Sequence, residues 1–146
     1  MGRSVVVVER RLLSVLCGFC VLCVCCVTAA AQSAAVKKGG SPEAARIKNP
    51  VVTSPESLSA GKRSYTRLCG KCHGPEGAGD GTGATGPVAP SDLTDAAWDY
   101  GSSDGEMFHV IRDGIPGSAD MEGYAARMSD TDIWNVVNYV RTLAKK

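Results

Sequence analysis

The sequence predicts an all-α domain of short helices joined by long loops. Apolar residues recur at three- and four-residue steps in three segments, which is typical of helices with one buried face. No alternating apolar and polar pattern of useful length predicts a β-strand. Glycines and prolines fill residues 74–90, which indicates a long irregular loop.

The N-terminal residues 1–31 have the pattern of an export signal. Arg3, Arg10 and Arg11 precede an apolar stretch at residues 12–27. A run of alanines then allows cleavage after Ala31. With the alanines included, the apolar stretch is also about long enough to stay as an uncleaved membrane anchor. We therefore expect an exported protein of the periplasm or cell envelope, either released by cleavage or tethered to the membrane through this segment.

The next segment, residues 32–54, is rich in Ala, Gly, Ser, Lys and Pro and has no sustained periodicity. Such a composition predicts a flexible linker, and its last part, NPVVTSP, is expected to run extended over the domain. The predicted folded domain covers residues 55–144.

The first predicted helix begins at Pro55, with Ser54 as its N-cap. Its apolar face consists of Leu58, Gly61, Tyr65 and Leu68. A glycine inside a helix costs about 1 kcal/mol relative to alanine. That cost indicates that another backbone passes close to Gly61.

Two more helices follow the glycine-rich loop. One is predicted over residues 104–113, where Ser103 and Glu106 form a capping box and Gly114 ends the helix. The other begins after Ser129, with Asp132 completing its cap. Its apolar stripe consists of Ile133, Val136, Val137, Val140 and Leu143. Such short helices leave a small core, which a large apolar cofactor would complete.

Charge is segregated along the chain, although the formal net charge is only +1. Basic residues predominate in residues 37–71, and acidic residues predominate in residues 74–132. This balance does not predict a nucleic-acid binder. The segregation favours a protein partner that recognises one charged face.

The stretch RLCGKCHGPEGAGDG contains Cys69, Cys72 and His73 in a Cys-x-x-Cys-His motif. The other five of the seven cysteines lie within residues 1–31. A redox dithiol would require a preceding buried strand, whereas a mostly polar helix is predicted here. A structural zinc site would require a fourth ligand, and His109 is the only other histidine in the chain.

Attachment of a haem fits the motif best. Two sulfurs one helical turn apart can reach both vinyl groups of a porphyrin, and the following imidazole can reach its iron. This attachment is made outside the cytoplasm, in agreement with an export signal. The motif therefore predicts one covalently attached haem c, held by Cys69, Cys72 and His73.

The chain resembles the small single-haem class I c-type cytochromes of the bacterial cell envelope. The resemblance covers about residues 49–143, and it depends on the stretches GKRSYTRLCGKCHGPEGAGDG, FHVIRDGIPGSADM and MSDTDIWNVVNYVRTL. It implies the cytochrome c fold, with three to five short helices and long loops wrapped around one haem. In that fold the first and last helices cross, and Gly61 and Tyr65 would meet Tyr139 at the crossing.

The resemblance also implies a methionine as the second ligand of the iron. Met121, in the loop after DGIPGSAD, lies where the family places this ligand, although Glu122 follows it where the family often has proline. We expect Met107 to pack in the core. We expect Met128 to act as a hydrophobic staple before the Ser129 cap.

Several other residues have two interpretations. His109 is expected to be a packed or solvent-edge histidine rather than a ligand. The resemblance implies that the carbonyl of a proline, Pro87 or Pro90, orients His73. Three aromatic residues are expected in the ordinary core rather than at the haem: Trp98, Tyr100 and Trp134.

Ligation by His73 and Met121 would leave no open position for a substrate, which predicts an electron carrier and not an enzyme. We expect a periplasmic one-electron shuttle between respiratory or dehydrogenase partners that present a basic docking surface. Two alternatives stay open. The chain could be the haem c subunit of a larger dehydrogenase or oxidase complex. It could also be a haem enzyme or a sensor of peroxide or gas, if Met121 is labile.

Overall fold

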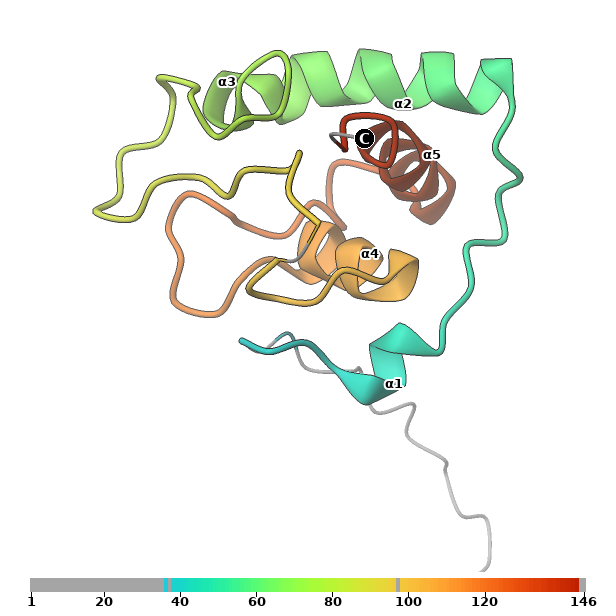
Figure 1. The fold of residues 1–146 in the computed structure, drawn as a ribbon, viewed down its shortest axis with the longest axis horizontal. Coiled ribbons are helices and arrows are strands. Elements are labelled where there is room, and N and C mark those ends of the chain that lie inside the picture. Colours follow the sequence, from blue (N-terminus) through green and yellow to red (C-terminus); the bar gives the residue numbers. More distant parts are fainter. Residues whose placement is uncertain (1–35, 37, 97, 145–146) are drawn as a thin grey trace, which may run out of the picture. The chain divides into compact units, whose positions relative to one another are not determined.

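The computed structural model describes residues 36, 38–96 and 98–144. Its secondary structure within these residues comprises α1 (Pro42–Ala45), α2 (Pro55–Leu68), α3 (Gly70–His73), α4 (Asp104–Asp113) and α5 (Asp130–Val140). An isolated antiparallel bridge joins Gly114 and Glu122, and no strand is present among the described residues. The all-α prediction is confirmed for this part of the chain (Figure 1). The expected export signal lies outside the described residues.

Helix α2 lies across α5, and the two helices meet at Gly61 (Figure 1). A Cβ atom at Gly61 would overlap the carbonyl oxygen of Asn135 and lie 2.8 Å from the Cβ of Tyr139. The ring of Tyr65 packs next to that of Tyr139, with centroids 5.3 Å apart. The expected close approach of a second backbone at Gly61 is confirmed, and it explains why this helix contains a glycine.

The helix starts follow the predicted capping pattern. The Ser54 hydroxyl accepts a hydrogen bond from the backbone N–H three residues later and caps α2. Ser103 and Glu106 form the expected capping box of α4. At α5 the Ser129 hydroxyl accepts from the backbone N–H of Asp132. Each cap satisfies a helix N–H that lacks a partner within the helix.

The buried core lies where α2, α4 and α5 meet. Phe108 of α4 stacks on Trp134 of α5, with ring centroids 4.1 Å apart and planes 13° apart. Met107 and Met128 are 4% and 8% exposed, which agrees with the packing roles expected for both. The other members of this core are Tyr65, Ile133, Val136, Val137 and Val140.

Residues 41–46, expected as part of a flexible linker, contain the short helix α1 and pack against α4. The Ser41 hydroxyl caps α1, and the Ser41 N–H donates to the Glu106 carboxylate at 2.9 Å. Ala44 is 1% exposed, and its carbonyl oxygen lies where a side chain at Gly105 would stand. The segment therefore packs against α4, because two small residues and one carboxylate let its backbone approach closely. The stretch NPVVTSP that follows lies along the domain, in agreement with the expected course.

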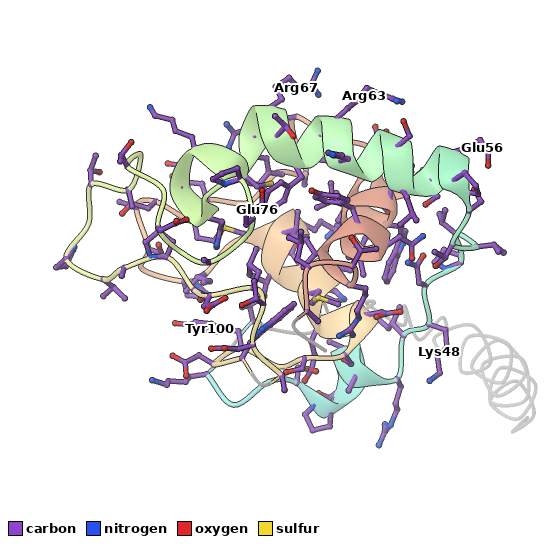
Figure 2. All side chains as sticks on the ribbon, turned by 45° about the horizontal axis from the view of Figure 1, so that its top comes forward. Lys48, Glu56, Arg63, Arg67, Glu76 and Tyr100 are labelled. Carbon is purple, nitrogen blue, oxygen red and sulfur yellow. The ribbon has the colours of Figure 1, made fainter. Side chains whose placement is uncertain are left out.

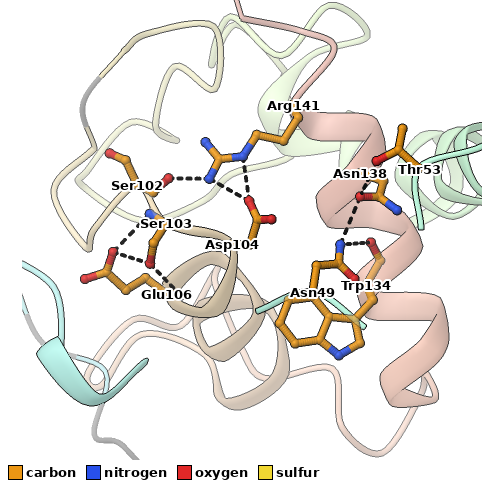
Figure 3. A network of polar contacts seen from close by, with 9 residues as sticks. All are labelled: Asn49, Thr53, Ser102, Ser103, Asp104, Glu106, Trp134, Asn138 and Arg141. Atoms are coloured by element: carbon orange, nitrogen blue, oxygen red, sulfur yellow. Dashed lines mark hydrogen bonds and ion pairs between the residues drawn. The ribbon is translucent and has the colours of Figure 1, made fainter. Parts of the chain in front are cut away.

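Asn138 of α5 holds the rest of this segment in place (Figure 3). Its Oδ1 accepts from Asn49 Nδ2 at 2.9 Å and from Thr53 Oγ1 at 3.1 Å. Its Nδ2 donates to the Val51 carbonyl at 3.1 Å and to Ser57 Oγ at 2.9 Å. The buried amide thus satisfies its hydrogen-bonding groups with the chain that leads into α2.

The ends of α4 and α5 are joined by Arg141, which follows α5. Its Nε donates to Asp104 Oδ1 at 2.8 Å, and its guanidinium also donates to the Ser102 carbonyl (Figure 3). Because Asp104 lies in the first turn of α4, this contact fixes the start of the helix that carries several residues of the cavity wall described next.

Candidate haem site

A cavity of about 590 Å³ lies beside α3 and the two long loops. Its wall includes all four predicted site residues, Cys69, Cys72, His73 and Met121. Its volume falls within the ~300–1,000 Å³ of typical ligand pockets. Apolar side chains form much of the remaining wall, among them Leu68, Leu93, Val110, Ile111, Ile115, Val136 and Val140.

The two cysteines lie one helical turn apart. Cys69 ends α2, and its carbonyl oxygen accepts from the N–H groups of Cys72 and His73 at 3.0 and 2.9 Å. Both cysteines are free thiols. Burial, together with the nearby Cys72 thiol, raises the pKa of Cys69 to about 12. A thiol held protonated is a poor nucleophile, which argues against a redox dithiol.

The described residues also contain no group of three or more His, Cys, Asp or Glu side chains arranged to hold a metal ion. A zinc site at Cys69 and Cys72 therefore has too few ligands in this part of the chain. The sulfur and imidazole donors at the cavity are the thiols of Cys69 and Cys72, the imidazole of His73 and the thioethers of Met107 and Met121. Met107 is 4% exposed and packs in the core, whereas Met121 lies in a loop. This set suits a haem bound through two cysteines, with the imidazole and one thioether available as iron ligands.

His73 is oriented by the carbonyl of Ser91, which lies 3.0 Å from the imidazole Nδ1. The expectation that Pro87 or Pro90 provides this carbonyl is therefore wrong, and the acceptor is the residue that follows Pro90. Burial lowers the pKa of His73, against the opposite effect of the Ser91 hydrogen bond, so the ring is neutral near pH 7. With Nδ1 protonated and bonded to Ser91, the lone pair is on Nε2, as an iron ligand requires.

Gly79 explains why the Pro90 carbonyl is not the acceptor. The Gly79 N–H donates to the His73 carbonyl at 2.9 Å, and its φ of 75° is in the left-handed region. A Cβ at this position would lie 2.5 Å from the Pro90 carbonyl oxygen. The Pro90 carbonyl thus faces the glycine loop, while that of Ser91 faces the imidazole. The sequence gives no signal for this choice, because it depends on how two distant loops pack.

Met121 lies in the loop after α4 and is half-buried. Its N–H donates to Ser118 Oγ at 3.0 Å, and its carbonyl accepts from the Ile115 N–H at 2.9 Å. Both backbone groups of Met121 are therefore engaged within its own loop. The loop closes at its base through the bridge between Gly114 and Glu122.

The other candidate histidine is not part of the cavity wall. His109 Nδ1 lies 3.0 Å from Asp113 Oδ2, one turn further along α4. His109 also contacts the edge of the Phe108 ring. This placement agrees with the expected packed or solvent-edge histidine.

Two of the three aromatic residues expected in the ordinary core contribute to the cavity instead. Trp98 and Tyr100 line the cavity, and the Trp98 indole N–H donates to the Asp95 carbonyl at 3.0 Å. Trp134 is buried in the core, as expected. The correction arises because residues 98–101 form a loop across the cavity rather than a helix with one buried face.

Sequence reasoning missed Tyr124, which also lines the cavity. Its hydroxyl donates to the Leu68 carbonyl at 3.2 Å, at the end of α2, and the Arg127 guanidinium lies 4.3 Å from its ring centroid. Tyr124 lies outside any helix, so no periodicity could have indicated it. A neighbouring contact supports the same region, since the buried Tyr65 hydroxyl donates to the Gly74 carbonyl at 2.7 Å.

The charged side chains of the cavity wall are acidic. Asp99 and Asp120 are the carboxylates among the described lining residues, and these residues include no Lys or Arg. Hydrogen bonds from the Thr85 backbone, the Thr85 hydroxyl and the Gly86 backbone lower the pKa of Asp120. This carboxylate is therefore charged at neutral pH, whereas the charge of Asp99 is paired with Lys38 at 3.3 Å.

Comparisons with known proteins agree with this site. A family model described as "Cytochrome C oxidase, cbb3-type, subunit III" matches residues 56–140. The fold is similar to a chain of the reducing HAO-like protein complex Kustc0457/Kustc0458 of Kuenenia stuttgartiensis, with a TM-score of 0.60 and 29% identity. That match covers 68% of this chain and 50% of the other.

A second similar structure is cytochrome CL from the marine methylotrophic bacterium Methylophaga aminisulfidivorans MPT. Its TM-score is 0.52 at 20% identity, and the match covers 73% of this chain and 60% of that one. The chain thus spans about half to three fifths of the length of these two relatives. Members of the family of c-type cytochrome domains carry electrons on a covalently bound haem c. The family match extends over more than half of the chain, so this protein belongs to that family, described as cytochrome c oxidase, cbb3-type, subunit III.

Proposed function

We propose that Cys69 and Cys72 attach the haem and that His73 and Met121 ligate its iron. The observation that carries this proposal is the single cavity whose wall contains all four side chains. Each thiol would add across one vinyl group: a carbon–sulfur bond forms, and the thiol hydrogen moves to the other vinyl carbon. This addition releases nothing and needs no oxidant, and it requires the free thiols that both cysteines have.

The chain's own residues keep the iron ligands in place. Ser91 holds the His73 ring with Nε2 directed to coordination, and a second-shell bond of this kind also raises the basicity of the imidazole. Met121 supplies a soft sulfur, which favours Fe(II) and raises the reduction potential. Apolar side chains of α4 and α5 exclude water from the cavity, which raises the potential further.

The haem, when bound, supplies one-electron exchange between Fe(II) and Fe(III). If His73 and Met121 both ligate the iron, no coordination position would be left open to a substrate. The residues that hold these ligands limit the rearrangement that accompanies each change of charge. Such a site suits transfer between proteins through the haem edge.

The rim of the cavity suits a redox partner with a basic surface. Asp120 contributes negative charge there, and Val88, on the loop that lines the cavity, is 78% exposed. The basic side chains Arg63 and Arg67 point away from the domain on the outer side of α2 (Figure 2). Electron transfer to the partner should therefore slow as the salt concentration rises. A rate independent of ionic strength would contradict this docking mode.

A permanent place in a larger complex is the second candidate function. One of the two similar structures is described as part of a protein complex, and the family description names an oxidase subunit. Purification of the native protein from membrane and soluble fractions separates the two candidates. A carrier would elute alone, whereas a subunit would elute with a stable stoichiometric partner.

We also propose that the protein is exported and that residues 1–31 direct this export. The folded domain would begin near residue 38, before Pro55, the first residue of the first helix predicted from the sequence. In the described residues, no helix has the length and hydrophobicity to span a membrane. Mass spectrometry of the exported protein tests the cleavage after Ala31 and the possible tether, and it counts the covalent haems.

Optical spectroscopy tests the ligands directly. Ligation by His73 and Met121 should give the oxidised protein a weak far-red band from charge transfer between sulfur and iron. It should also leave the reduced protein unable to bind carbon monoxide readily. A high-spin spectrum with fast binding of carbon monoxide would instead support a haem enzyme or gas sensor.

A further inference from the structure

Asp120, the residue before Met121, bonds to the loop that follows α3. Its Oδ1 accepts from the Thr85 N–H at 3.1 Å and from Thr85 Oγ1 at 2.9 Å. Its Oδ2 accepts from the Gly86 N–H at 2.6 Å. One carboxylate therefore receives three hydrogen bonds from two consecutive residues that belong to neither a helix nor a strand.

The contact leaves no room for a side chain at residue 86. A Cβ there would lie 2.5 Å from Asp120 Oδ2. A side chain at residue 86 would therefore displace the Asp120 carboxylate from its present position. Glu122, on the other side of Met121, is a useful contrast, because it is an exposed acid of the same charge.

These bonds connect two separate walls of the cavity. Residues 84, 86–90 and 115–121 all line it. The other hydrogen bonds of residues 115–121 in the described chain stay within that loop, as with Met121 and Ser118 or Met121 and Ile115. The hydrogen bonds of Asp120 hold the loop of residues 115–121 to the loop that contains Thr85 and Gly86. Without them, the loop is anchored at its base alone.

We propose that Asp120 is a positioning residue that joins the Thr85–Gly86 loop to the Met121 loop and keeps the methionine sulfur on the haem iron. The inference rests on the proposed ligation by Met121. A neutral thioether is a weak ligand for Fe(III), so its dissociation depends on how easily its loop moves away. A loop held at both ends moves away less often than one held at its base.

The experiment measures the binding of cyanide to the oxidised haem protein, in which cyanide replaces the methionine sulfur. The variant Asp120→Ala removes all three acceptor contacts and should bind cyanide about tenfold faster than the wild type. It should also lose the far-red band at a lower temperature. Thr85→Val removes one donor and keeps the backbone contacts, so it should give a smaller increase in the same direction.

The matched control is Glu122→Gln. It removes the same charge next to Met121 but no contact between the loops, so its rate of cyanide binding should stay near that of the wild type. A shift in reduction potential shared by Asp120→Ala and Glu122→Gln reports the lost charge. A faster exchange seen in Asp120→Ala alone reports the lost connection. If Asp120→Ala assembles poorly, Asp120→Asn and Thr85→Val provide the same comparison in folded protein.

The outcomes separate this inference from the ligation on which it rests. A wild-type protein without the far-red band would overturn Met121 as the ligand, and the role of Asp120 with it. A wild-type protein that has the band, together with an Asp120→Ala variant that exchanges at the wild-type rate, would overturn the role of Asp120 alone. Equal acceleration in Asp120→Ala and Glu122→Gln would overturn it as well, because charge would then explain the effect.

Discussion

The Pro90 carbonyl oxygen lies 2.5 Å from where a side chain of Gly79 would begin, so the loop after α3 packs directly on the segment that orients His73. Gly79 also has a φ of 75°, which other residues rarely adopt. The close contact and the positive φ therefore both require a glycine at residue 79. The next carbonyl after that of Pro90, which is that of Ser91, reaches the His73 imidazole.

The variant Gly79→Ala should therefore lower the free energy of unfolding by more than the backbone strain alone. The left-handed conformation costs a non-glycine residue about 1–2 kcal/mol. Displacement of Pro90 adds to this cost and should also change the reduction potential through His73. The matched control is Gly117→Ala, where φ is 81° and no described atom lies within 4 Å. Equal destabilisation and an unchanged potential in both variants would show that the Pro90 contact is unimportant.

Gly61→Ala should destabilise the domain by about 1–3 kcal/mol, because the new methyl group meets backbone atoms of α5 that cannot rotate away. Chemical unfolding of the haem protein measures this loss. Gly70→Ala serves as the control, since its nearest neighbours would lie at 3.7 Å, an ordinary contact distance. An unchanged midpoint for Gly61→Ala would mean that α2 and α5 can separate at little cost.

Replacement of both Cys69 and Cys72 by alanine should abolish covalent haem. The mass of the denatured protein should then equal that of the polypeptide, whereas either single variant should keep one thioether bond. Without the cofactor, the cavity of about 590 Å³ loses its main contents, so the double variant should also unfold at a lower temperature. Covalent haem in the double variant would contradict the assignment of these two cysteines.

Glu106 should make the stability of the domain depend on pH in the acid range. Burial opposes its ionisation, but hydrogen bonds from Ser103, Ser41 and Ser102 outweigh it, and the pKa lies below the usual 4.5. A lowered pKa in the folded state gives a stabilisation that is complete above about pH 4.5 and is lost as the pH falls through the folded value.

Unfolding by urea at neutral and at acid pH tests this dependence. The variant Glu106→Gln should be less stable than the wild type at neutral pH, and the difference should shrink in acid. The exposed Glu76, changed to Gln, controls for the loss of one negative charge. A constant difference between wild type and Glu106→Gln across the pH range would contradict the role of the carboxylate.

Local signals explain what the sequence could predict. Ser54, Ser103 and Ser129 cap their helices through residues only three positions away, so their roles can be identified from short patterns. Gly61 was identifiable because a glycine inside a helix has a cost that requires a reason. The motif at Cys69, Cys72 and His73 is also local, and the structure places all three at one cavity.

Distant contacts explain what the sequence did not predict. The part of the expected linker around α1 is packed because Ser41 and Glu106, which are 65 positions apart, form a hydrogen bond. The acceptor for His73 is the carbonyl of Ser91, 18 positions away. The packing of Gly79 against the Pro90 carbonyl leaves the Ser91 carbonyl facing the imidazole. Polar pairs and loop carbonyls of this kind have no periodicity that a reader of the sequence could recognise.

The four hydrogen bonds at the Asn138 side chain have a consequence for how the domain opens. Residues 49–57 cannot separate from α5 without exposing the Asn138 side-chain amide, which is 6% accessible in the folded state. Because their hydrogen bonds all end on this one amide, these residues should separate from α5 together. The early part of the domain and its last helix should therefore form a single cooperative unit. Amide hydrogens in both regions should exchange with solvent at the same free energy of opening, although Ser57 and Asn138 are 81 positions apart in the sequence.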